Sequence, residues 1–116
     1  MDNKEIMDRL DMIEFRQELL FNNTGIDRSM FEYGITRKQY RLIMDLMDKY
    51  REKIDKGEQC SHGVFESEMY EIIPEHKGDY HMCEEFAKGF MDEGRWDEVF
   101  MELYGNMPKY SYLRKE

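Results

Sequence analysis

The stretch from Thr36 to Gly57, TRKQYRLIMDLMDKYREKIDKG, predicts one long amphipathic helix. Thr36 and Gln39 match a capping box, in which each side chain bonds the other residue's backbone at the start of a helix. Two lysines followed by a glycine are typical of a helix end. The apolar residues recur every three or four positions and so share one face; they are Tyr40, Ile43, Met47, Tyr50 and Ile54.

A second long helix is predicted before it, with Asp2 or Asn3 as its cap and the segment 22–25 as its end. Its seam resembles that of a coiled coil and has one polar member. The two seams can pair within the chain as a hairpin or equally between subunits; between subunits, Gln17 would specify the register. The candidate oligomer seam consists of Ile6, Leu10, Ile13, Gln17 and Leu20.

Three shorter helices are predicted in the second half, beginning at Ser61, at Asp79 and near Trp96. Pro74 and two glycines are their expected ends. The sequence SMFE at 29–32 matches a capping box and predicts a single helical turn. The expected core residues are Phe65, Met69, Ile72 and Ile73, then Tyr80, Cys83, Phe86, Ala87 and Phe90, then Trp96, Val99, Phe100 and Leu103.

The predicted fold class is therefore all-α: a single-domain bundle of about five helices, two longer in the N-terminal half and three shorter in the C-terminal half. Residues 1–105 form the expected helical domain, and residues 106–116 an irregular C-terminal tail, since the tail shows no helical period. A hydrophobic content of 41% is enough for a packed core.

The negative charge of the chain lies in its second half. Residues 58–102 carry thirteen carboxylates against three basic residues, and the whole chain has a net charge of −9. Such a charge disfavours direct nucleic-acid binding and favours a protein partner with a basic surface. Each acidic row alone is an ordinary solvated face; merged, the rows would form one negative field that steers a basic partner. The candidate partner-binding residues are Glu68, Glu71, Glu75, Glu85, Asp92, Asp97, Glu98 and Glu102.

A metal-dependent reaction is the main alternative. Cys60, His62, His81 and Cys83 are residue types that bind zinc, but their spacing departs from that of zinc knuckles. A buried thiol beside an exposed histidine is the simpler interpretation of these positions. Glu68 and Glu71 form one E-x-x-E pair without the second pair that a helical magnesium site needs. We therefore expect no catalytic residue, no metal and no cofactor.

The expected location is the cytoplasm. Two cysteines are too few for a disulfide framework, the first residues lack a signal-peptide core, and no apolar run approaches the length of a membrane span.

The order of these features resembles the YhaI-like family of small helical bacterial and phage proteins of unknown function. The resemblance rests on Arg9–Phe15, on Gly34–Thr36, and on the region from His81 to Phe100, including the sequence GRWDEVF at 94–100. It spans most of the chain but consists of apolar positions and one glycine turn. It implies an all-α, oligomer-prone fold without an established activity, and it transfers no functional residues.

The function expected from the sequence is that of a non-enzymatic cytosolic interaction or regulatory protein, which oligomerises and presents an acidic helical surface. A narrower hypothesis is a small acidic inhibitor of phage type that blocks a nucleic-acid-handling protein. The alternative is a metal-dependent helical enzyme that uses carboxylates or the Cys60, His62, His81 and Cys83 set.

Overall fold

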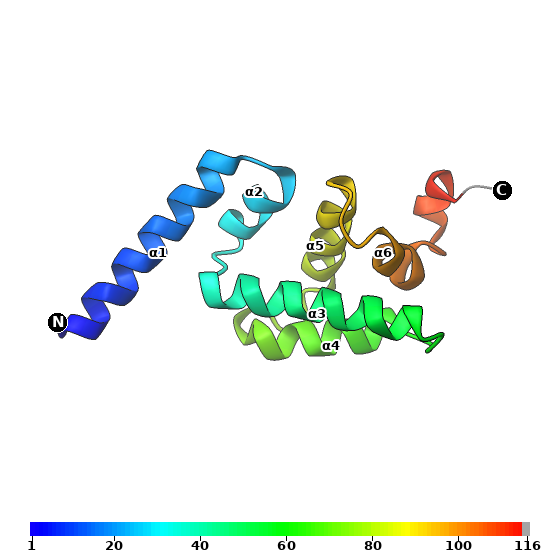
Figure 1. Ribbon diagram of the computed structural model, residues 1–116, viewed down its shortest axis with the longest axis horizontal. Coiled ribbons are helices and arrows are strands. Elements are labelled where there is room, and N and C mark those ends of the chain that lie inside the picture. The colour runs from blue at the N-terminus through cyan, green and yellow to red at the C-terminus, as the bar shows by residue number, and fades with distance from the viewer. Residues whose placement is uncertain (115–116) are drawn as a thin grey trace.

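The computed structural model describes residues 1–114, which form six α-helices and two 3₁₀ helices and contain no strand (Figure 1). The predicted all-α class is confirmed. In chain order the elements are α1 (Asn3–Asn22), α2 (Gly25–Glu32), α3 (Arg37–Asp55), α4 (His62–Ile72), η1 (Pro74–His76), α5 (Tyr80–Asp92), α6 (Asp97–Tyr104) and η2 (Pro108–Leu113).

The predicted count of five helices is wrong, because the N-terminal half contains a third helix, α2. Its cap is the side chain of Thr24, which accepts a hydrogen bond from the backbone N–H of Asp27 at 3.1 Å. The helix therefore begins before the expected turn at 29–32, and Ser29 lies inside it. Ile26 and Met30 on its inner face are fully buried, so packing of this face helps to hold the short helix in place.

The other predicted helix starts are confirmed. Asp2 caps α1, Ser61 caps α4 and Asp79 caps α5, each by accepting a bond from the N–H three residues later. At α3 the capping box is complete, because the side chain of Gln39 also accepts from the N–H of Thr36 at 3.0 Å. These caps satisfy N–H groups that have no partner within the helix.

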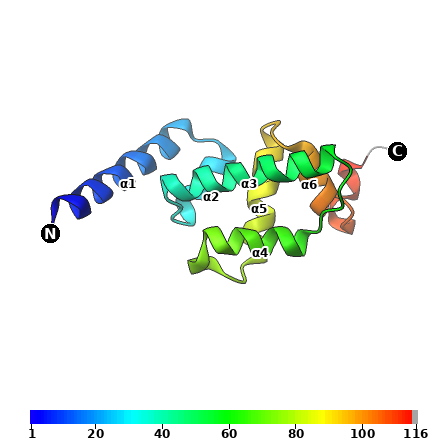
Figure 2. The same cartoon turned by 60° about the horizontal axis from the view of Figure 1, so that its bottom comes forward.

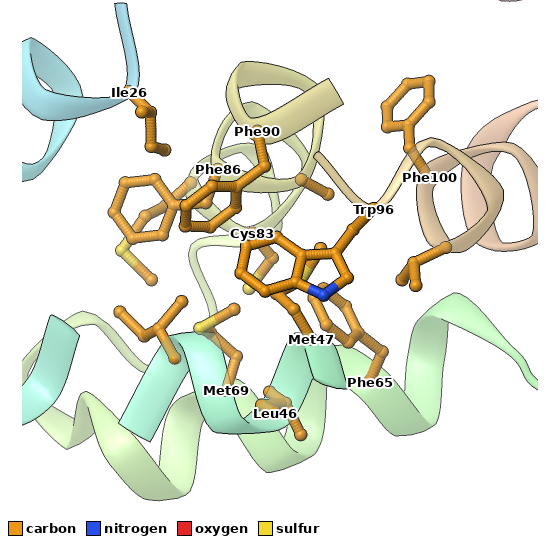
Figure 3. Packing of buried hydrophobic residues seen from close by; sticks show 14 of the residues in the cluster. Ile26, Leu46, Met47, Phe65, Met69, Cys83, Phe86, Phe90, Trp96 and Phe100 are labelled. Carbon is orange, nitrogen blue, oxygen red and sulfur yellow. The ribbon is translucent and has the colours of Figure 1, made fainter. Parts of the chain in front are cut away.

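The core lies where α5 and α6 pack on α3 and α4 (Figure 3). Phe86 and Phe90 of α5 and Trp96 at the start of α6 point towards side chains of α3 and α4. Trp96 is not inside α6 but at its N-cap, with a left-handed φ of 54°, and its indole N–H donates to Asp48 of α3 at 2.9 Å. The expected core position Tyr80 is wrong: its side chain is 54% exposed at the first residue of α5, whereas Met82 and Cys83 of the same turn are fully buried.

The first helix projects from the rest of the molecule. Both views show its N-terminal half extending away from every other helix (Figures 1 and 2). The molecule measures 56 × 26 × 24 Å, with a radius of gyration of 15.5 Å. A compact domain of this length has a radius of roughly 13 Å. The excess reflects the projecting half of α1, in which residues 3–11 are all exposed.

The segment predicted as an irregular tail contains η2, which packs against α5 and α6; residues 115 and 116 lie outside the described part of the chain. Tyr110 of η2 meets the ring of Phe100 edge-on at 4.9 Å. Its hydroxyl donates to the carboxylate of Glu84, which also receives a bond from Lys109 Nζ at 2.6 Å. Glu84 is only 9% exposed, so the tail supplies the partners of a buried charge.

We expect this contact to make the stability of the fold depend on pH through the ionisation of Glu84. Burial alone would raise the pKa of Glu84, but the bonds from Lys109 and Tyr110 outweigh burial and lower it. A carboxyl whose pKa is lower in the folded state stabilises the fold above its unfolded pKa of about 4.3, and this stability is lost as the pH falls through the folded pKa. The melting temperature of Glu84→Gln should therefore lie below that of the wild type at pH 6. At pH 3 the difference between the two melting temperatures should be smaller.

Thermal unfolding followed by circular dichroism between pH 6 and pH 3 tests this expectation. Glu71→Gln is the matched control, since the exposed Glu71 makes no hydrogen bond or ion pair within residues 1–114. If the curves of wild type and Glu84→Gln stay parallel over the whole range, Glu84 does not carry the pH dependence.

Candidate interaction surfaces

The predicted seam of α1 is uncovered in the protomer. Ile6 is 42% exposed, Leu10 47%, Ile13 54% and Leu20 53%, and Gln17 is exposed between them. In a water-soluble helix such a row is normally turned towards a core. Here it faces outward, and so it is the largest set of regularly spaced apolar side chains that the described chain leaves in water.

The opposite face of α1 attaches the helix to the body. Phe15 and Leu19 are buried, and the ring of Phe15 lies 5.8 Å from that of Tyr40 in edge contact. On the same side, Arg37 of α3 bridges Asp11 at 3.1 Å and Glu18 at 2.6 Å. At about 100° per residue, these contacts lie roughly half a turn from the seam.

The seams of α1 and α3 therefore do not pair as a hairpin in the protomer. Ile43, Met47 and Tyr50 of the α3 stripe are buried in the core instead, and Tyr40 and Ile54 are partly buried beside it. Of the two arrangements compatible with the sequence, pairing of the α1 seam between subunits remains open.

Two apolar residues beside the seam were missed by the sequence reasoning. Met7 is 63% exposed and Phe21 is 90% exposed, both along one edge of the same row. Arg9 and Glu14 flank the row on opposite edges, and neither forms an ion pair within the described residues. Helical spacing could have revealed all four, because each lies three or four positions from a seam residue.

Three of the predicted partner-binding acids lie in one groove between α3 and α4. Glu68, Glu71 and Glu75 line a cavity of about 590 Å³ together with Lys38 and Leu42. Only Glu71 has its carboxylate unengaged there. Glu75 accepts a bond from the Gln39 amide at 2.7 Å, and Glu68 accepts from Lys49 at 2.7 Å and Tyr50 at 2.8 Å.

The contacts of Glu68 give that carboxylate a structural role. Burial works to raise its pKa, but the bonds from Lys49 and Tyr50 outweigh burial and lower it. The residue joins α3 to α4 through a partly buried charge. Its negative charge is already balanced by a lysine, and it adds less to an external field than its place in the sequence suggests.

The acidic row of α5 lies in a different groove. Glu85 and Asp92 line a cavity of about 460 Å³ between α2, α5 and η2, and Asp92 is paired with Lys88 at 2.6 Å. Asp97 and Glu98 are exposed in the first turn of α6, and Glu102 is exposed one turn further along. The structure thus divides the predicted acids between separate grooves and the surface of α6.

The cysteine and histidine side chains do not assemble a metal site. Across residues 1–114, no group of three or more His, Cys, Asp or Glu side chains is placed to hold a metal ion. Cys83 is buried, whereas His81 is exposed and its ring lies 4.2 Å from that of Tyr80. Burial raises the pKa of Cys83 to about 12 and also raises that of Cys60, so neither thiol is activated as a nucleophile.

An arginine-lined cavity of about 330 Å³ lies at the base of α1. Arg37, Arg41 and Arg95 line it together with Glu18 and Asp27, so that both signs of charge are present. Arg37 is engaged by α1, and Arg95 lies over the ring of Trp96 at 4.6 Å. Asp27 accepts a bond from the Tyr40 hydroxyl at 3.0 Å. Most of the polar groups at this cavity thus serve to hold α1, α2 and α3 together.

None of the helices formed by residues 1–114 is long and apolar enough to cross a membrane. No protein-family model, curated protein or solved structure matches the chain. The resemblance to the YhaI-like family therefore stays a prediction from the sequence.

Proposed function

We propose that this chain is a non-enzymatic interaction protein that self-associates through α1. The observation that carries the proposal is the uncovered apolar row on a helix that projects from the body. Contiguous exposed apolar surface on a folded protein marks an interaction site, because leaving it in water is unfavourable. A second helix packed along the row would remove these side chains from water without disturbing the core face of α1.

The acidic half is then the surface left for a different partner. Glu71, Glu85, Asp97, Glu98 and Glu102 are exposed, and none of them forms an ion pair among the residues described. Free carboxylates of this kind favour a basic protein surface. This supports the proposal of an acidic regulatory protein and, more narrowly, of an inhibitor that covers a basic nucleic-acid-binding surface.

Replacing Glu71, Glu85 and Glu98 together by Gln should weaken binding to a partner recovered from the native host and flatten the dependence of this binding on salt concentration. Titration calorimetry at two or more salt concentrations measures both effects. A matched triple change at exposed acids outside the acidic half, Glu5, Asp8 and Glu52 to Gln, should leave the binding unchanged. An unaltered affinity in the first variant would remove the support for the acidic surface.

Self-association is tested by placing charge in the seam. Leu10→Glu combined with Ile13→Glu should convert a multimer into a 14.2 kDa monomer, with an increase in the dissociation constant of at least about 100-fold. Light scattering after size exclusion gives the mass. Helical content should persist, because neither side chain contributes to the core.

The matched control is a charge exchange on the opposite side of the projecting half, Lys4→Glu with Asp8→Lys, where both side chains are exposed. It should keep the multimer. A wild-type protein that is monomeric at high micromolar concentration would contradict the proposed function.

A further inference from the structure

We propose that α1 packs against the α1 helices of further copies of this chain in a parallel, in-register bundle of more than two helices. The inference rests on the self-association proposed above and adds its orientation, register and minimum number of copies.

The width and residue types of the row indicate the number of helices. In heptad terms Leu10 and Gln17 take position a, and Ile6, Ile13 and Leu20 take position d. Leucine at a with isoleucine at d shifts parallel coiled coils from two strands to three or four. Met7 and Phe21 at position e widen the row beyond the a/d seam that suffices for two strands, and both are well exposed.

The available area is consistent with a stable assembly. On the order of 100 Å² is exposed on each of the six apolar side chains, so two copies that covered the whole row would bury on the order of 1,200 Å², the lower limit of specific interfaces. A third copy touches both of the others and adds the area of its own row, on the order of 600 Å². The body of each chain is attached through Phe15 and Leu19 on the opposite face of α1, so the attachment leaves the row itself uncovered.

The charges beside the row favour the parallel orientation. In a parallel bundle position g of one helix faces position e of its neighbour, so Arg9 meets Glu14 of the next copy. In an antiparallel pair like positions face each other, so in the alignment that overlaps the whole seam Arg9 would meet Arg16 and Glu14 would meet Met7, and neither charge would face an opposite one. Arg16 is also held towards its own chain, where its guanidinium lies 3.8 Å from the ring centre of Phe31.

Gln17 specifies the register. With equal alignment of all copies, the Gln17 amides form one layer and bond one another. A shift of one heptad would set Gln17 of one helix against Leu10 of its neighbour and leave that amide without a partner in an apolar layer, which is unfavourable.

The experiment combines mass measurement with cysteine cross-linking in the full-length chain carrying Cys60→Ser. Asn3→Cys places a thiol at position a near the tip of α1, and Asp8→Cys places one on the outer side of the same region. A short bismaleimide should link Asn3→Cys chains efficiently and Asp8→Cys chains poorly. In an antiparallel bundle, two Asn3 positions would lie on the order of 25–30 Å apart and would not be linked.

The expected result is a mass above twice 14.2 kDa together with linkage at Asn3→Cys. A dimeric mass overturns the number of copies. A multimer that is linked only when Asn3→Cys and Phe21→Cys chains are mixed overturns the parallel orientation and leaves the proposed function standing. A monomer overturns both proposals.

Discussion

Replacing Phe90 by alanine is expected to lower the free energy of unfolding by about 3–5 kcal/mol. The ring is fully buried, meets Trp96 edge-on at 4.9 Å and lies 6.3 Å from the ring of Tyr40. It thus joins α5 to both α3 and the start of α6. Removing it leaves a cavity that rigid helices fill only partly, and an effect of this size is a large part of the stability of a single domain.

Urea unfolding followed by circular dichroism measures this loss. Tyr80→Ala on the same helix is the control, since the sequence pattern assigns both positions to the core but Tyr80 is 54% exposed. The control should cost less than about 1 kcal/mol. Phe90→Leu supplies a milder change should the alanine variant fail to fold. Equal losses for Tyr80→Ala and Phe90→Ala would contradict the arrangement of α5.

The second large effect is expected at the buried carboxylate of Glu84. Combining Lys109→Met with Tyr110→Phe removes both groups that bond it while keeping the ring that packs on Phe100. The variant should lose about 2–3 kcal/mol, because a charge that is 9% exposed is left with neither bond. Thermal or urea unfolding at pH 7 measures the loss.

A third change separates this cause from general disruption of η2. Adding Glu84→Met to the double variant removes the buried charge itself, and stability should recover by at least about 1 kcal/mol. Such recovery is expected only if the unpaired carboxylate is the source of the loss. A triple variant less stable than the double would show that η2 acts through packing alone.

The helix starts could be predicted because their hydrogen bonds are local. Each N-cap bond joins residues three positions apart, as in Asp2 with Glu5 or Ser61 with Val64, so the sequence contains both partners. The same rule placed the second helix incorrectly, because Thr24 and Ser29 both have the chemistry of a cap. Thr24 is the cap in the structure, and the helix that begins there buries Ile26 and Met30. These side chains are buried by residues distant in the sequence.

Spacing alone predicted which residues share a face, but not what covers that face. The stripes of α1 and α3 have the same three-and-four pattern, yet one is exposed and the other forms the core. Likewise, the helical spacing places Glu68 and Glu71 in the same acidic row and does not distinguish them. Only the packing of α3 on α4 brings Lys49, nineteen residues before Glu68, within bonding distance of the Glu68 carboxylate. The carboxylate of Glu71 stays free within residues 1–114.

By itself the sequence determined the all-α class, most helix starts and ends, and the apolar row of α1, because each depends on interactions within a few residues. The tertiary structure decided that the row projects into water, that the acids divide between separate grooves, and that η2 neutralises Glu84. Those outcomes depend on which helices meet in space, and contacts between distant segments are not encoded in local periodicity.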